Sequence, residues 1–206
     1  MPKRGAPPEV NAGSMADIAF LLLIFFLVTT TIETDAGLDR MLTPIEPPET
    51  DVVIKQKNIF EVIINKNGQL FADEELVEVS QLREKAMSFL DNGGAPSGTP
   101  DYCNYCQGAR NTSSSDNPSK AIISLKNDRE TPYGTYITVQ NEIVGAYNDL
   151  RNREAQRLYK RDFTAMEAAY LNPETAESLK DDLKEKVKNI QDLFPQKFSE
   201  ADTSNN

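Results

Sequence analysis

Residues 17–28 read DIAFLLLIFFLV, and the rest of the chain is arranged around this stretch. Between residues 13 and 32 lie 20 residues with a single charge, that of Asp17. A helix needs about 20 apolar residues to cross a hydrocarbon layer of roughly 30 Å. We therefore predict a transmembrane helix over residues 13–32.

Asp17 is the unusual residue of this predicted helix. An aspartate inside a spanning helix costs about 2.5–3.5 kcal/mol on insertion, so such a residue marks a functional site. Steps of three and four place four side chains on the face of Asp17, which we predict to meet a partner: Leu21, Ile24, Val28 and Thr31. The plainer interpretation is a helix that begins at Ser14 or Met15, where a first-turn carboxylate interacts favourably with the helix dipole.

The charges on either side orient the predicted helix. Lys3 and Arg4 precede it, whereas acidic residues follow it. Because basic residues are retained on the cytoplasmic side, we expect a cytoplasmic N-terminus and an outer C-terminal domain. The alternative is a cleaved signal peptide, which also has a basic start and an apolar core. An uncleaved anchor is favoured, since no clear small-x-small cleavage site follows the core and an acid opens it.

Whole-chain composition narrows the function classes. The net charge of −10 argues against nucleic acid as a partner, because the chain as a whole has no excess of positive charge to neutralise the phosphates. The sequence has no histidine, the commonest metal ligand and the commonest general base at neutral pH. It also has no glycine-rich phosphate loop and no recognisable nucleophile motif. These features argue against an enzyme, and we expect no cofactor other than protons.

The chain divides into five predicted segments: cytoplasmic tail 1–12, transmembrane helix 13–32, proline-rich linker 33–51, outer α+β domain 52–160, and helical extension with a disordered tail 161–206. The linker reads TPIEPPET at residues 43–50, a composition that predicts a semi-rigid spacer. Its plain role is a tether that holds the outer domain off the membrane. The sharper alternative is a strand-like peptide that docks on the domain or on a partner.

Two strands and a helix open the outer domain. Apolar residues alternate over 58–65, which predicts a strand, and a short return strand follows at 70–72. Between them, Asn67-Gly68 accepts the positive φ that a tight hairpin turn needs. The next segment predicts a helix with Ser80 as its cap, a stop at 92–94 and a buried face formed by Leu82, Ala86, Phe89 and Leu90.

A strand and a long helix follow in the same domain. Residues 121–125 predict a short apolar strand, and Thr131-Pro132 opens the helix with a hydroxyl cap and a proline at the first position. Six apolar residues recur at helical spacing and are predicted to face the sheet: Tyr136, Ile137, Ile143, Val144, Tyr147 and Leu150. The order strand, strand, helix, strand, helix predicts a small α+β (ββαβα-like) domain.

Both cysteines lie in a predicted surface insertion. Residues 93–119 are rich in Gly, Ser, Pro, Asn and Asp, and they contain Cys103 and Cys106. In an oxidising compartment this pair forms a local disulfide; otherwise the two residues are free thiols. A thioredoxin-like redox centre needs a strand followed by a helix N-terminus, which this loop lacks. Two cysteines without a histidine also argue against a zinc site or haem attachment.

The C-terminal part is helical and highly charged. A basic stretch predicts a solvated helix face, with contact to a polyanion as the alternative: Arg151, Arg153, Arg157, Lys160 and Arg161. After a break at Asn172-Pro173, an apolar stripe is either core or a seam for a partner helix: Leu179, Leu183, Val187 and Ile190. We predict disorder for residues 201–206.

Four features together resemble the ExbD/TolR family over about residues 9–150. They are Val10-Asn11, Asp17 at the start of an apolar span, Leu42-Thr43-Pro44, and the small outer domain with its strand residues 124–126 and turn Asp128-Arg129. The insertion 93–119 and the extension after Arg151 depart from the family pattern. The strand that usually ends the domain is not obvious in this sequence.

The resemblance implies an accessory subunit of a proton-driven motor in the bacterial inner membrane, with the C-terminal domain in the periplasm. It implies a dimer of this chain inside a pentameric ring of channel subunits of the ExbB/TolQ family. The complex would energise a TonB-like transducer or the Tol–Pal system. Asp17 matches the family's proton-carrying aspartate.

Elementary electrostatics agrees with this role for Asp17. A carboxylate in a low-dielectric helix interface is pushed toward its neutral form, while a water-filled or hydroxyl-lined pocket permits ionisation. Alternation between these settings would load and release a proton, and a potential of 100 mV supplies about 2.3 kcal/mol per charge. The alternative is a passive membrane-anchored binding module that grips the cell wall or a receptor without proton transfer.

Overall fold

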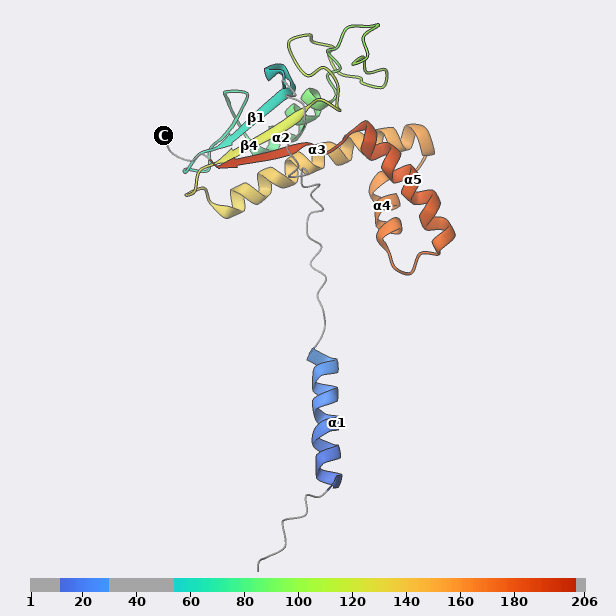
Figure 1. Cartoon of the computed structure of the whole chain (residues 1–206). Coiled ribbons are helices and arrows are strands. Elements are labelled where there is room, and N and C mark those ends of the chain that lie inside the picture. The colour runs from blue at the N-terminus through green and yellow to red at the C-terminus, as the bar shows by residue number, and fades with distance from the viewer. Residues whose placement is uncertain (1–11, 30–53, 203–206) are drawn as a thin grey trace, which may run out of the picture. The chain divides into compact units, whose positions relative to one another are not determined.

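The computed structural model describes residues 12–29 and 54–202 (Figure 1). The chain divides into two units, Met1–Arg40 and Met41–Asn206, and the described residues of each are considered separately. Several predicted features lie outside the described residues: Val10-Asn11, the linker 33–51 with Leu42-Thr43-Pro44, and the last residues 203–206.

The first unit contains the helix α1 (Ala12–Thr29). Its sequence has no proline, so the backbone hydrogen bonds from residue i to residue i−4 continue without a break. Within the described residues, no helix combines the length and the apolar character that crossing a membrane requires. Residues 30–32 of the predicted span are not among those described, so the span over 13–32 stays a prediction.

The second unit is built on a five-stranded sheet with the strand order β3-β2-β1-β4-β5. The strands are β1 (Ile59–Ile64), β2 (Leu70–Ala72), β3 (Glu75–Val77), β4 (Ile122–Asn127) and β5 (Phe198–Asp202). The first three form an antiparallel meander, whereas β4 runs parallel to both β1 and β5. This mixed sheet with its helices confirms the predicted α+β class.

The predicted hairpin of β1 and β2 is confirmed. Alternate residues of β1 are buried, namely Phe60, Val62 and Ile64, as a strand with one covered face requires. Gly68 closes the turn by donating its N–H to the Asn65 carbonyl oxygen at 2.9 Å. The φ angle of Gly68 is +74°, a value that glycine adopts without strain.

The strand β3 was not predicted. Asp73 and Glu74 make the turn into it, and their φ angles are +48° and +68° without the help of a glycine. Within β3 itself, Glu75 and Leu76 are exposed and only Val77 is buried. Three residues with one buried side chain show no alternation of apolar and polar residues. The strand therefore forms because it pairs with β2, and its own sequence does not predict it.

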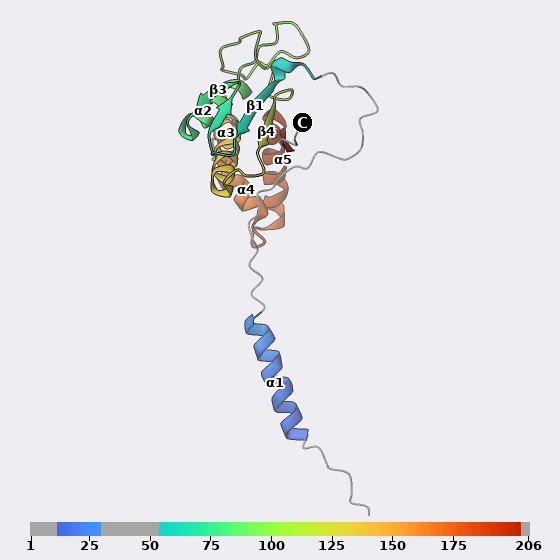
Figure 2. The ribbon, with the colours of Figure 1, turned by 90° about the vertical axis from the view of Figure 1, so that its left-hand side faces the viewer.

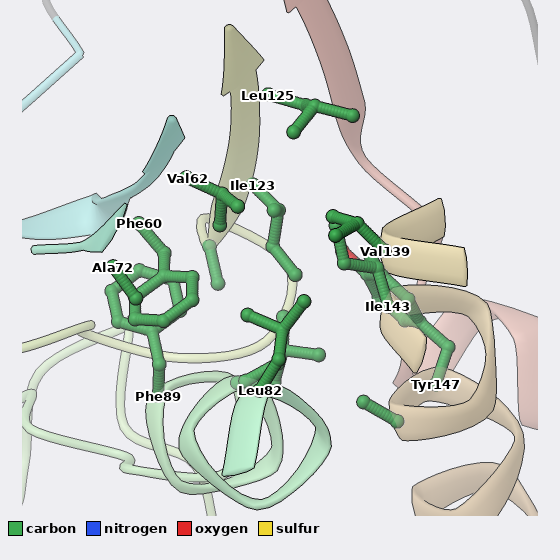
Figure 3. Packing of buried hydrophobic residues seen from close by; sticks show 14 of the residues in the cluster. Phe60, Val62, Ala72, Leu82, Phe89, Ile123, Leu125, Val139, Ile143 and Tyr147 are labelled. Atoms are coloured by element: carbon green, nitrogen blue, oxygen red, sulfur yellow. The ribbon is translucent and has the colours of Figure 1, made fainter. Parts of the chain in front are cut away.

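Two helices cover the buried face of the sheet (Figure 3). They are α2 (Val79–Leu90) and α3 (Tyr133–Tyr159). Phe60 of β1 stacks on Phe89 of α2 with ring centroids 5.2 Å apart. The predicted buried face of α2 is confirmed, but that of α3 is partly wrong. The α3 residues buried in the core under the sheet are Val139, Ile143, Ala146, Tyr147 and Leu150, with Tyr136 partly buried against them. Ile137 and Val144 lie half-buried on the flank of α3.

Both predicted helix caps are wrong. The residue before α2 is Glu78, whose backbone N–H donates to the Gln81 side chain at 3.1 Å, and Ser80 lies inside the helix. At the start of α3 the N-cap is Pro132. The Thr131 hydroxyl instead lies 3.3 Å from the carbonyl oxygen of Ile64, at the end of β1. The Thr131 hydroxyl therefore bonds to a residue distant in the sequence instead of capping the helix.

The C-terminal residues form a helical hairpin at the end of α3 (Figure 2) and then return to the sheet beside β4 (Figure 1). The helices are α4 (Phe163–Leu171) and α5 (Glu177–Leu193), separated as predicted by Asn172-Pro173. The stripe on α5 is core: Leu183, Val187 and Ile190 are buried in a second cluster with Phe163 and Met166, while Leu179 is 45 % exposed. The predicted disorder from residue 201 is wrong for Ala201 and Asp202, which pair with β4.

The insertion 93–119 has no helix or strand at any of its residues, yet buried polar contacts anchor it. The Asn92 side chain donates to the carbonyl oxygens of Asn111 and Ser115, each at 2.8 Å. The Ser115 hydroxyl donates to the Phe89 carbonyl oxygen at 2.6 Å, at the C-terminal end of α2. The insertion is thus fixed to the domain rather than loosely attached to it.

Asp116 fixes the other end of the insertion. Its carboxylate accepts a hydrogen bond from the Asn58 side chain at 3.2 Å and lies 2.5 Å from the Lys57 ammonium and 3.3 Å from that of Lys55. Its side chain is only 3 % exposed. Burial alone would raise the pKa of Asp116, but these donors outweigh it and hold the pKa below its ordinary value.

This pKa predicts how stability depends on pH. A carboxyl whose folded-state pKa is lowered stabilises the fold above its unfolded pKa of 3.8, and that contribution is lost as pH falls through the folded pKa. We expect the free energy of unfolding of the wild-type chain to drop over this acidic range more than that of Asp116→Asn. At neutral pH the variant should be less stable by about 1–3 kcal/mol. Urea unfolding at several pH values measures both effects; parallel pH curves would contradict the prediction.

Candidate functional site

Asp17 lies in the second turn of α1, not in the first. It is the sixth residue of the helix, which begins at Ala12 and has no acidic residue in its first turn. The favourable interaction with the helix dipole fades beyond the first turn. The plainer interpretation needs a helix start at Ser14 or Met15, and α1 does not have it.

The side chains that follow Asp17 on α1, from Ile18 to Phe26, are apolar and exposed in the isolated chain. Those on its own face include Leu21 and Ile24, whereas the Val28 side chain and the whole of Thr31 lie outside what the structure describes. The exposed apolar side chains point in all directions around the axis: Met15, Ile18, Phe20, Leu21, Leu22, Leu23, Ile24, Phe25 and Phe26. A helix that is apolar on every side is normally buried, either in a protein core or in lipid.

The chemistry available on α1 is limited to one group. Between Ala12 and Thr29 the Asp17 carboxyl is the only side chain that titrates. Such a group can take up and release a proton when its access to water changes.

The cysteines lie in the other unit, and they are joined by a disulfide. Cys103 and Cys106 are buried, and Arg110 brackets the turn between them. Its guanidinium donates to the carbonyl oxygens of Cys103 and Cys106 at 2.6 and 2.7 Å. The polar composition of this loop did not predict the burial of its cysteines.

The basic stretch after residue 150 is not a simple solvated face. Arg151 is buried, and its Nε donates to the Phe194 carbonyl oxygen at 3.0 Å. Arg153 binds both carboxylate oxygens of Asp91 at 2.5 and 2.8 Å, and this hydrogen bonding raises the pKa of Arg153. Glu154, which is fully buried, accepts from Arg153 at 3.2 Å and from Arg157 at 2.7 Å. The network joins α3 to the end of α2.

Metal chemistry has no support in the described part of the chain. Among residues 12–29 and 54–202, no three His, Cys, Asp or Glu side chains are grouped so that they could hold a metal ion.

Comparison with known families tests the resemblance directly. A family model described as "Biopolymer transport protein ExbD/TolR" matches residues 3–151, well over half of the 206 residues. The chain belongs to the ExbD/TolR family. The match includes α1 with Asp17, the strands β1 to β4 and most of α3, whereas α4, α5 and β5 lie beyond it. No curated protein sequence matches the chain. The family comprises subunits for biopolymer transport, so this is the broad function of the chain.

Proposed function

We propose that this ExbD/TolR-family chain is the accessory subunit of a proton-motive-force-driven motor of the bacterial inner membrane, with Asp17 as the proton carrier. In this proposal the motor energises TonB-dependent transport across the outer membrane. One observation carries it: the only titratable group of α1 lies beyond the first helical turn, and the side chains that follow it, from Ile18 to Phe26, are all apolar and exposed.

The exposed apolar surface of α1 supports a position inside the membrane. Large exposed apolar patches mark contacts with proteins or lipid. We place the face of Asp17, Leu21 and Ile24 against a partner and the opposite face against lipid or a second copy of the chain. The partner is a channel subunit of the ExbB/TolQ type, five copies of which form a ring around a dimer of this chain. The flanking charges support a cytoplasmic N-terminus and a second unit in the periplasm.

The proposed cycle needs only one carboxyl on each chain. Facing a watery or hydroxyl-lined pocket on one side, Asp17 releases its proton; facing an apolar helix surface, it is driven to the neutral form. The membrane potential biases the direction of transfer, with about 2.3 kcal/mol per charge at 100 mV. Rotation of the ring and the dimer against each other would pass through the linker to the second unit and then to a TonB-like transducer. No enzymatic step and no cofactor is required.

Proton flux in a reconstituted system tests this proposal. The full chain is placed in liposomes with an ExbB/TolQ-type subunit and a TonB-like transducer, and a potassium gradient with valinomycin sets the membrane potential. We expect proton uptake, followed with a pH-sensitive dye, only when the chain and the ring subunit are both present. Liposomes with the ring subunit alone are the control. Equal flux with and without the chain would contradict proton transfer and would support the alternative, a passive membrane-anchored module.

A further inference from the structure

We propose that the Cys103–Cys106 disulfide is a redox-controlled latch that holds the end of α5 and the strand β5 in place on the second unit. Reduction of the disulfide would loosen this C-terminal segment while the rest of the domain stays folded. The proposal rests on contacts within the second unit alone, so it does not depend on proton transfer by Asp17.

The disulfide closes a tightly packed turn. Both cysteines are almost fully buried, with 3 % and 5 % exposure. Gly93 approaches so closely that a Cβ atom added to it would lie 2.8 Å from the Cys106 Cβ. Arg110 bonds to the carbonyl oxygens on either side of the turn, as described above. This packing therefore fixes the conformation of the residues between the two cysteines.

Tyr105, which lies between the cysteines, contacts the C-terminal end of α5. Its hydroxyl donates to the Leu193 carbonyl oxygen at 2.7 Å. Its ring packs edge-on against Phe194 with centroids 5.6 Å apart. The last carbonyls of a helix have no partner within the helix, so Tyr105 satisfies one of them. Burial raises the pKa of Tyr105 to about 12, which keeps the hydroxyl a donor at neutral pH.

The held segment leads directly into β5. Only residues 195–197 separate Phe194 from Phe198, the first residue of the strand. Within this connection, Lys197 accepts the Ile123 N–H of β4 at 3.0 Å, and its ammonium donates to the Ser119 carbonyl oxygen at the end of the insertion. The insertion thus contacts the segment at both of its ends, near residues 193 and 197.

The opposite side of the same segment is held by α3. Arg151 donates to the Phe194 carbonyl oxygen, and the Tyr147 hydroxyl donates to that of Lys197 at 3.3 Å. These bonds do not involve the insertion and would survive reduction. We therefore expect local loosening of the end of α5 and β5 rather than unfolding of the domain.

A pocket of about 290 Å³ lies beside Cys106, and we propose that a reductant enters there. It is lined by Asn104, Tyr105, Cys106, Gln107 and Arg157, but not by Cys103. A thiolate of a dithiol would attack the Cys106 Sγ, break the bond between the sulfurs and leave the electron pair on the Cys103 Sγ. The Cys106 N–H donates to that sulfur at 3.1 Å and would stabilise the thiolate. The second thiol then attacks the mixed disulfide and releases Cys106. Two electrons and two protons pass from the dithiol to the cysteines.

Hydrogen exchange of the full chain in detergent, followed by mass spectrometry, tests the latch. Oxidised protein is compared with protein reduced by dithiothreitol, and a mass gain of two hydrogens verifies the reduction. We expect the amides of residues 198–202 to exchange at least about tenfold faster after reduction, with the β1–β2 hairpin unchanged. The oxidised Tyr105→Phe variant, which lacks only the hydroxyl, should exchange faster at the same residues.

Three results would overturn the latch. The first is equal protection of β5 in the oxidised and reduced chains. The second is resistance of the disulfide to dithiothreitol in the folded chain, because the pocket would then give no access. The third is a loss of protection throughout the second unit, which would make the disulfide a general stabiliser. The Cys103→Ser/Cys106→Ser variant, where it folds, should match the reduced wild type.

Discussion

Replacement of Asp17 by Asn should abolish energy-dependent transport and proton flux while the complex still assembles. Asparagine has nearly the shape of aspartate, so the packing of α1 is kept and only the titratable proton is removed. Because Asp17 is the only titratable side chain of α1, no neighbour on that helix can replace it. We expect transport to fall to the level of cells that lack the chain. Uptake of a TonB-dependent substrate and proton flux in liposomes measure the two losses.

Asp17→Glu is the matched control for this variant. It keeps the carboxyl and moves it by one methylene, so it should retain part of both activities. Membrane fractionation and co-purification with the ring subunit show that each variant assembles before its activity is compared. Normal transport by assembled Asp17→Asn would rule out the proton-carrier role and leave a passive anchored module. Equal loss in Asp17→Asn and Asp17→Glu would point to packing at this position rather than to the proton.

The Arg153→Met variant should lose about 3 kcal/mol of stability, within the range for breaking a buried ion pair. The substitution leaves the Asp91 carboxylate buried without its bidentate partner, and it removes one of the two donors to Glu154. The loss lies at the lower end of that range because the Arg153 side chain is 28 % exposed and Arg157 still pairs with Glu154. Urea unfolding of the full chain, followed by circular dichroism, measures the change.

Arg161→Met is the matched control, since Arg161 belongs to the same basic stretch but is exposed. It should change the free energy of unfolding by no more than about 0.5 kcal/mol. Adding Asp91→Asn to Arg153→Met should recover part of the loss, because the uncompensated carboxylate is removed. If Arg153→Met and Arg161→Met were equally mild, the basic stretch would act as the solvated face that the sequence alone suggested.

The elements that could be predicted are those whose signal is local. The alternation over β1, the Asn-Gly turn after it and the helical spacing on α2 all follow from residues within one turn or one strand of each other. The N-cap residues predicted for α2 and α3 were wrong. The Thr131 hydroxyl has a partner at the end of β1, far away in the sequence, and local capping rules do not include such partners.

The sequence by itself determined that an apolar helix would carry one carboxyl, because the composition of residues 12–29 needs no distant partner to be understood. Only the tertiary structure decided the roles of Arg153, Tyr105 and β5. Each depends on a group more than 60 residues away: Asp91 for Arg153, Leu193 for Tyr105, and β4 for β5. A strand such as Phe198–Asp202 has little apolar character of its own. Its residues form a strand because their backbone N–H and C=O groups pair with those of β4.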